Sequence, residues 1–290
     1  MGLSGKTLDI SLNLYIRNFF KNTNSVIDMG DQDLNVGFEE IESKFKKFNI
    51  NFDKELFGPA KKYPERPRVS SSAFWKTLGI EVTDRIDIME LPRTKNDNLG
   101  KLHKYDLNKP FDNQELIGKY DLVTDFGNNE HPFNIAETYK TMHKLCKKGG
   151  VLFIDQAFLG GNGYYNFDIS FFENLAAVND YSCIHSSLVF NFKDKYFSTP
   201  IDRDYIRYIN MEKLNNISQI FILRKNSDLD FKFPYQGTGK KMPAEEYYEL
   251  DYVGKELPLE KIYLPNSVDK IPTKTLIRTL ISRFKKKIVK

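Results

Sequence analysis

A short stretch near the start of the chain, residues 24–34 (Asn-Ser-Val-Ile-Asp-Met-Gly-Asp-Gln-Asp-Leu), constrains the fold most strongly. Two β-branched residues, Val26 and Ile27, lead to Asp28 and Gly30, where the apolar run stops. A buried strand that ends at such a turn is typical of the first strand of a nucleotide-binding α/β unit, which holds its ligand at the carboxyl end of the strand. Gly30 would allow a tight turn and a close approach of the backbone to a ligand.

The stretch resembles motif I of the class I S-adenosylmethionine (SAM)-dependent methyltransferases, which reads acid-x-Gly-x-Gly-x-Gly. Asp28 stands at the acidic position and Gly30 at the first glycine, whereas Gln32 and Leu34 replace the second and third glycines. In the family those glycines let the loop pass close to the methionine part of the cofactor. The resemblance implies that Asp28, Gly30 and Gln32 bind SAM. A turn with a purely structural role is the alternative.

Length, charge and cysteine content bound the class of protein. The 290 residues, 40% of them hydrophobic, suffice for one large domain or one domain with an appended piece. The net charge of +4 argues against a dedicated nucleic-acid binder, whose positive charge is usually larger and clustered. Cys146 and Cys183 lack disulfide or zinc spacing, so we expect both to be reduced. We find no transmembrane run of ~20 apolar residues and no signal-peptide core, and we therefore expect a cytoplasmic protein.

Two further acids follow predicted strands. Residues 79–90 contain the second strand, and an acid at its end, Asp87, could accept hydrogen bonds from both ribose hydroxyls of an adenosine ligand. Glu90 is a weaker candidate for that role. The resemblance implies that Asp106, after a short third strand, binds the adenine amino group, whereas without it Asp106 would be a turn or cap residue. The proline-rich residues 51–69 are predicted to form a surface loop, with a flap over the site as an alternative.

The longest ordered match lies between residues 118 and 155. It comprises a predicted buried strand from 120 to 126, a polar loop that carries Glu130 and His131, an amphipathic helix from 133 to 145, a Lys-Lys-Gly-Gly stop and another strand. This arrangement resembles motif IV of the same methyltransferases, and the resemblance adds Asp125 to the expected cofactor-binding residues. Asp125 or Asp155 could also ligate a metal ion, but no cluster of ligands supports one, and we predict none.

The remaining elements complete an α/β pattern. Helices are predicted at 8–20, 36–48, 70–78 and 204–214, and strands at 181–192 and 217–225. The resemblance implies a Rossmann-like, seven-stranded sheet with helices on both faces, whose last strand runs antiparallel between the fifth and sixth. We assign residues 1–225 to this domain and 226–290 to a C-terminal extension. Its basic, amphipathic end could touch a membrane surface or a protein partner, or simply pack on its own domain.

Methyl transfer from a sulfonium requires few protein groups, because the leaving group is already activated. The enzyme aligns acceptor, methyl and sulfur and excludes water, and an alcohol acceptor also needs a general base. His131, at the expected end of the fourth strand with Glu130 beside it, is the best candidate, although it could instead pack against or cap the next helix. His143 is expected to be structural, and His185 could reach the site from the sixth strand.

These observations favour a SAM-dependent methyltransferase that acts on oxygen of a small-molecule acceptor. The variant motif and the glycine-rich, aromatic loop near residue 160 look similar to methyltransferase-like proteins of bacterial surface-glycan clusters, which implies a sugar or glycan precursor. The alternative is a non-catalytic protein of the same fold that acts as a binding partner or scaffold. An NAD-dependent Rossmann enzyme ranks last, because the required Gly-x-Gly-x-x-Gly is missing at Gln32 and near Asn35.

Overall fold

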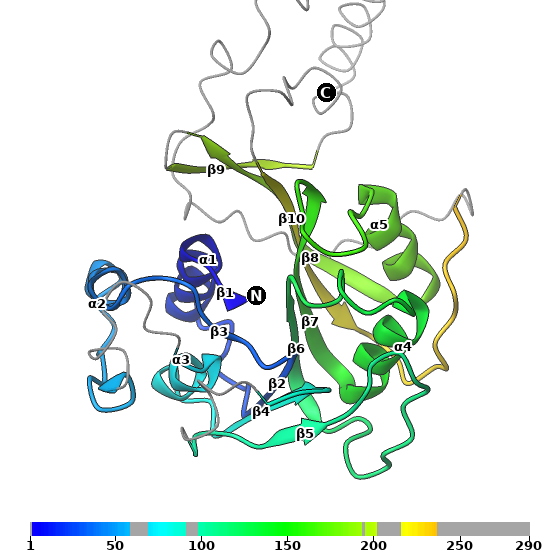
Figure 1. Ribbon diagram of the computed structural model, residues 1–290, viewed down its shortest axis with the longest axis horizontal. Coiled ribbons are helices and arrows are strands. Elements are labelled where there is room, and N and C mark those ends of the chain that lie inside the picture. The colour runs from blue at the N-terminus through cyan, green and yellow to red at the C-terminus, as the bar shows by residue number, and fades with distance from the viewer. Residues whose placement is uncertain (1, 59–68, 91–97, 193–194, 202–215, 237–290) are drawn as a thin grey trace, which may run out of the picture.

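A central sheet of eight strands organises the computed structural model, which describes residues 2–58, 69–90, 98–192, 195–201 and 216–236. The strands lie in the order β5-β4-β2-β6-β7-β10-β8-β9 (Figure 1). Their bounds are β2 (Ser25–Met29), β4 (Val82–Asp87), β5 (Leu102–Lys104), β6 (Tyr120–Phe126), β7 (Cys146–Leu159), β8 (Tyr181–Phe192), β9 (Lys195–Pro200) and β10 (Ile217–Lys225). A separate two-stranded sheet pairs β1 (Gly2–Leu3) with β3 (Asp33–Leu34).

The strand order confirms the predicted topology and adds one strand to it. β2 pairs in parallel with β4 and β6, β4 with β5, and β6 with β7. β10 runs antiparallel between β7 and β8, as expected for the last strand of a class I methyltransferase sheet. All seven predicted strands are present, and residues 195–200 add an eighth, β9, which pairs with β8 in a hairpin. This pairing satisfies backbone groups that β8 would otherwise expose at the sheet edge.

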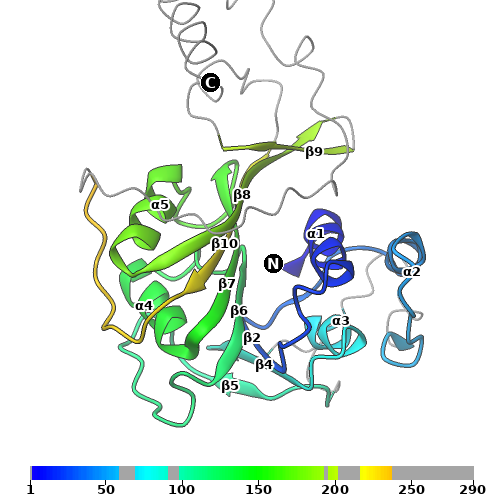
Figure 2. The ribbon, with the colours of Figure 1, turned by 180° about the vertical axis from the view of Figure 1, so that it is seen from behind.

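Helices cover both faces of the sheet, as predicted. Figures 1 and 2 show α1, α2 and α3 on one face, and α4 and α5 on the other. Trp75 and Phe74 lie in the apolar layer under the first group, and Tyr139 and Phe172 lie in the layer under the second. The helices are α1 (Gly5–Ile16), α2 (Phe38–Lys47), α3 (Ser71–Thr77), α4 (Ile135–Leu145) and α5 (Ile169–Val178).

Two local predictions need correction. α1 begins at Gly5 rather than at residue 8, with Ser4 as its cap: the Ser4 Oγ accepts the Thr7 N–H at 3.5 Å. The Lys-Lys-Gly-Gly run at 147–150 does not cap α4, which ends at Leu145. The run lies within β7, where the register against β6 shifts, and it forms a bulge there.

Some predicted elements lie outside the described residues. These are the helix at 204–214, most of the proline-rich segment and nearly all of the C-terminal extension, of which only residues 226–236 are described. Among the described residues, no helix is long and apolar enough to cross a membrane.

Candidate functional site

The turn after β2 is built around Gly30. Its φ of +87° is a backbone conformation that favours glycine. A Cβ at this position would lie 2.4 Å from Oδ1 of Asn128, in the loop after β6. The Gly30 N–H also donates to the carbonyl oxygen of Ile86 on β4 at 2.7 Å. Gly30 therefore brings the carboxyl ends of β2, β4 and β6 together, at the edge where α/β folds bind nucleotides.

The two positions that depart from motif I are buried rather than open. Gln32 is fully buried, and its Nε2 donates to the carbonyl oxygen of Met29 at 2.7 Å. Leu34 is also fully buried, within β3, which pairs with the N-terminal strand β1. Side chains and an added strand thus fill the space over which a glycine-rich loop would run.

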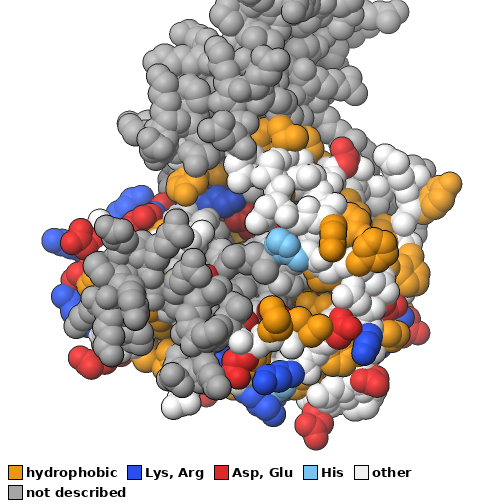
Figure 3. Space-filling model, viewed as in Figure 1, with side chains coloured by type: hydrophobic (Ala, Val, Ile, Leu, Met, Phe, Trp, Pro, Cys, Tyr) orange, Lys and Arg blue, Asp and Glu red, His pale blue; other side chains and the backbone are white. Residues whose placement is uncertain are grey.

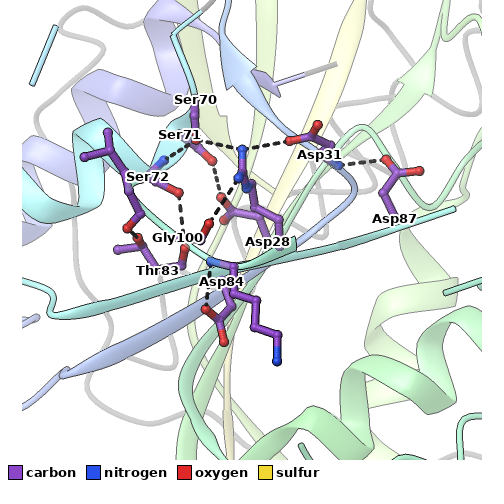
Figure 4. A network of polar contacts seen from close by, with 12 residues as sticks. Asp28, Asp31, Ser70, Ser71, Ser72, Thr83, Asp84, Asp87 and Gly100 are labelled. Carbon is purple, nitrogen blue, oxygen red and sulfur yellow. Dashed lines mark hydrogen bonds and ion pairs between the residues drawn. The ribbon is translucent and has the colours of Figure 1, made fainter. Parts of the chain in front are cut away.

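Asp87 stands at the end of β4, as predicted, and faces the turn after β2. Its Oδ2 accepts the backbone N–H of Asp31 at 2.7 Å (Figure 4). Its Oδ1 accepts the backbone N–H of Met89 at 3.1 Å. A carboxylate has about four acceptor positions, so two stay available for the hydroxyls of a ribose. The half-buried side chain is therefore suitable for the predicted ribose contact.

Asp28 points to the α3 side of β2, where it is almost fully buried. Its carboxylate accepts hydrogen bonds from the hydroxyls of Ser71 and Thr124 and, at 3.2 Å, from Nε1 of Trp75. Burial raises its pKa to about 6, although these donors and Arg85 act in the opposite direction. These hydrogen bonds give Asp28 a structural role, because they join β2 to α3 and β6. Its expected contact with a cofactor stays a prediction.

A buried ion pair supports the same turn. Nη1 of Arg85, on β4, lies 3.0 Å from Oδ1 of Asp31, and both side chains are almost completely shielded from solvent. Nη1 also donates to the hydroxyl of Ser70 at 3.2 Å, and Nη2 donates to the Gly100 carbonyl oxygen at 3.3 Å. Figure 4 shows that Asp31 lies between the serines at the start of α3 (Ser70, Ser71 and Ser72) and Asp87.

Asp106 follows β5, as predicted, but its bonds are those of a turn. Its Oδ1 accepts both the backbone and the side-chain N–H of Asn108, each at 3.0 Å. These hydrogen bonds lower the pKa of the carboxyl. Asn108 in turn contacts the cap of α4 through Asn134. The turn role is thus visible, and the adenine contact stays a prediction.

Asp125, near the end of β6, is completely buried on the α4 side. It accepts the backbone N–H groups of Asn128 and Asn129 at 3.2 and 3.0 Å, Nε2 of Gln156 at 2.7 Å and the hydroxyl of Tyr139 at 3.4 Å. Burial nevertheless raises its pKa to about 7. Asp125 therefore shapes the loop after β6 from beneath, and its own contact with a cofactor stays a prediction.

Glu130 and His131 are neighbours in this loop after β6. Oε1 of Glu130 lies 3.6 Å from Nε2 of His131, which accepts and donates no hydrogen bond among the described residues. Burial lowers the pKa of His131, so its imidazole is neutral at neutral pH and can accept a proton. The Glu130 carboxylate accepts backbone N–H groups of the glycine-rich loop, among them Asn162 and Gly163, and burial raises its pKa. Glu130 therefore fixes the loop beside the candidate base.

A cavity of about 510 Å³ opens next to Glu130. Its walls come from the N-terminal segment, the ends of β6 and β7, the glycine-rich loop, and β8, β9 and β10. Lys6 and Asp155 form an ion pair there at 2.8 Å. The residues lining it are Gly2, Ser4, Lys6, Asn35, Phe126, Gly127, Glu130, Asp155, Gln156, Ala157, Gly160, Gly161, Asn162, Val189, Phe190, Tyr196, Asn216 and Ser218. The cavity lies at the carboxyl ends of β6 and β7, and none of the expected cofactor-binding residues lines it.

Exposed aromatic rings stand beside the same loop. Phe133 and Tyr164 are each about three-quarters exposed, and their ring centroids lie 6.2 Å apart in an edge-to-face arrangement. The Tyr164 N–H donates to the carbonyl oxygen of Glu130 at 2.8 Å. Figure 3 shows hydrophobic side chains gathered on the part of the surface over α4 and its neighbouring loops.

Two other histidines, His143 and His185, do not join the site. Nδ1 and Nε2 of His143 bond to the Tyr181 hydroxyl and the Leu229 carbonyl oxygen, and burial lowers its pKa to about 4. His185 is buried and contacts the Ser187 hydroxyl at 3.0 Å; like His131, it does not line the cavity. No group of three potential metal ligands occurs in the part of the chain that the structure describes.

Comparisons with known proteins found only remote structural similarities. No protein-family model and no curated protein matches the sequence. A SAM-dependent methyltransferase from Archaeoglobus fulgidus is 15% identical, with a TM-score of 0.40 over 76% of this chain and 94% of that one. An O-methyltransferase from a Brevibacillus brevis multienzyme, in complex with S-adenosylhomocysteine, is 12% identical, with a TM-score of 0.42 over 77% and 73%. Identities this low do not transfer an activity.

The strand order identifies the fold without these comparisons. The chain has the class I methyltransferase fold. Within this methyltransferase fold the adenosine side fits the cofactor, because Gly30 and Asp87 occupy the edge at which a ribose would lie. The methionine side departs from the family pattern at Gln32.

Sequence reasoning missed two parts of this methyltransferase-fold site. Arg85 was missed, although a charged residue in the middle of a predicted sheet strand, two positions before Asp87, is a signal of a buried ion pair. Lys6 was also missed, because its partner Asp155 is 149 residues away and only the tertiary structure unites them.

Proposed function

We propose that this protein is a SAM-dependent methyltransferase that methylates an oxygen of a small polar acceptor, a sugar or glycan precursor. The observation that carries the proposal is that Gly30, Asp87 and His131 lie at or just after the carboxyl ends of the neighbouring parallel strands β2, β4 and β6, in the region where Glu130 borders a polar cavity. Asp87 would hold the ribose of the cofactor. The cavity beside Glu130 would hold the acceptor.

His131 would act as the general base. A neutral imidazole accepts the proton that an acceptor hydroxyl loses as the carbon–oxygen bond forms. The depressed pKa keeps His131 in this form at neutral pH. Glu130 would orient the imidazole and, through its bonds to the glycine-rich loop, keep water away from the reacting atoms. The bound cofactor would supply the activated methyl group.

A non-catalytic protein of the same fold is the second candidate, and one observation favours it. Gln32 and Leu34 are buried at the positions of two family glycines, so the loop does not leave the usual passage for the methionine part of SAM. A protein that had lost cofactor binding in this way could still serve as a binding partner or scaffold.

Titration calorimetry with SAM and with S-adenosylhomocysteine separates the two candidates. We expect micromolar binding of at least one of them to the purified protein. Asp87→Ala should weaken this binding strongly, since the ribose hydroxyls lose their acceptor, while His131→Ala should leave it unchanged and slow turnover of an acceptor. No binding of either ligand to folded protein would favour the non-catalytic candidate. Unaltered binding by Asp87→Ala would refute the role of Asp87.

A further inference from the structure

The Lys6–Asp155 ion pair forms part of the cavity wall, which is an unusual position for two mostly buried charges. Nζ of Lys6 lies 2.8 Å from Oδ1 of Asp155 and also donates to the hydroxyl of Ser218. Oδ2 of Asp155 accepts the Thr7 hydroxyl at 3.0 Å. Both charged side chains are mostly buried, with exposed fractions of 15% and 7%, yet they line a cavity rather than a packed core. Partly desolvated charges of this kind are costly unless further hydrogen bonds satisfy them.

Hydrogen-bonding capacity is left over on both partners. An ammonium group has three donors, and the described contacts of Lys6 use two of them. A carboxylate has about four acceptor positions, and the described contacts of Asp155 also use two. The pair can therefore donate to one oxygen and accept from another at the same time. Hydroxyl groups on neighbouring carbons match this pairing, because their oxygens lie about as far apart as two hydrogen-bonded atoms.

The rest of the wall supports a hydroxyl-rich, uncharged ligand. Gln156 is fully buried and lines the cavity, and its Oε1 has no hydrogen-bond partner among the described residues. Amide and hydroxyl side chains alternate there with the rings of Phe126, Phe190 and Tyr196. The charged lining residues are Lys6 against Asp155 and Glu130, so an anionic ligand would meet a net negative wall.

We propose that the Lys6–Asp155 pair binds a vicinal diol of an uncharged, polyhydroxylated acceptor, and that the N-terminal segment thereby takes part in acceptor selection. The inference rests on the proposed function, because the bound molecule is taken to be the methyl acceptor. It adds the chemical group that is recognised, a vicinal diol, and the residues that recognise it. Lys6 and Asp155 are assigned to binding, and the proton transfer stays with His131.

Saturation-transfer NMR with defined probes tests the inference. The probes are cyclohexane-1,2-diol and methyl α-D-glucopyranoside, with cyclohexanol as the probe that lacks the second hydroxyl and D-glucuronate as the anionic probe. We expect the diol and the glucoside to bind more tightly than the monol and the uronate. In the double variant Lys6→Met/Asp155→Asn, diol affinity should fall by about tenfold or more, because charge-assisted hydrogen bonds are lost.

A matched control is available in an ion pair that joins α1 to α2. Lys44 and Asp9 form an ion pair of the same length, 2.8 Å, with similar exposure, but neither residue lines the cavity. Lys44→Met should therefore leave diol binding unchanged. If the double variant does not fold, Asp155→Asn alone, which preserves the shape of the side chain, should still reduce diol binding.

Three results would overturn the inference: equal affinity for diol and monol, unchanged diol binding in the folded variants, or no probe bound by folded wild-type protein. Calorimetry with SAM on the same samples distinguishes the failures. SAM binding without diol binding refutes the diol site and leaves the proposed function standing. Diol binding without SAM binding leaves the site standing and refutes the methyltransferase activity.

Discussion

Replacement of Asp125 by asparagine should make the protein less sensitive to pH. The carboxyl is completely buried, and folding raises its pKa from 3.8 to about 7. A group whose pKa rises on folding holds its proton more tightly in the folded state. The stability that it contributes is therefore fully present below pH 3.8 and is lost as the pH rises through about 7. Asp125→Asn removes this titration.

The expected size follows from the two pKa values. A shift from 3.8 to about 7 corresponds to a total loss of about 4 kcal/mol, and the part that falls between about pH 5 and pH 8 is about 2–3 kcal/mol. The variant should fit locally, because an asparagine oxygen can still accept the N–H groups of Asn128 and Asn129. Rotation of the Gln156 amide would let its unpartnered Oε1 accept the new Nδ2–H group.

Urea unfolding of both proteins at several pH values measures the effect. The only tryptophan, Trp75, is fully buried and reports the transition by fluorescence. The variant's unfolding free energy relative to wild type should rise by about 2–3 kcal/mol from about pH 5 to pH 8. Asp28, with a pKa of about 6, and His143, with a pKa of about 4, titrate in both proteins and cancel in this difference. A difference that stays flat with pH would refute the raised pKa of Asp125.

Three further substitutions test the packing around the site. Gly30→Ala should cost about 1–3 kcal/mol in thermal unfolding, because the positive φ and the contact with Asn128 both oppose a Cβ; unchanged stability would mean that the turn differs. Arg85→Met should cost about 3–5 kcal/mol in urea unfolding by removing the guanidinium that pairs with the buried Asp31 carboxylate, and Arg85→Met/Asp31→Leu should recover part of it; no recovery would argue against the ion pair as the cause. Phe172→Ala should cost about 3–5 kcal/mol by the same assay, since the ring is fully buried; a loss below about 1 kcal/mol would contradict its place in the core.

Local patterns were sufficient to predict most of the fold. The β-branched run before Gly30, the acid at position 87 and the apolar spacing of α4 each depend on neighbours within a few residues. The antiparallel position of β10 followed from the resemblance to a family, since no local signal carries it. The predictions of the parallel strands were confirmed because a strand that is buried on both faces has little choice of register.

Predictions failed where one local signal fits two structures. A Lys-Lys-Gly-Gly run is a good helix stop, and Gly149 does adopt a positive φ of +78°. The structure uses that conformation for the bulge of β7 instead, because Cys146 already pairs with Tyr120 and commits the chain to a strand. β9 was missed for a related reason, since its pairing depends on the exposed edge of β8.

The cavity could not be predicted from any local pattern. Lys6 meets Asp155 and Ser218 across separations of 149 and 212 residues, and nothing within the three segments indicates that these residues meet. Only the closing of the sheet and the docking of α1 bring the three together. Sites of this kind become visible when charge, burial and an adjoining cavity are considered at once.

The loop after β2 has partners for its backbone groups, although it lacks two of the glycines of motif I. Buried backbone groups without partners would destabilise such a loop. Here the N–H of Leu34 donates to the Val69 carbonyl at 2.8 Å, and that of Asn35 donates to the Leu3 carbonyl at 2.9 Å. The carbonyl of Gln32 accepts the N–H of Ser71 at 3.1 Å. Because these partners lie on β1 and at the start of α3, the N-terminal segment that closes the loop is also the one that contributes Lys6 to the cavity. A change in this segment should therefore affect both halves of the candidate site together.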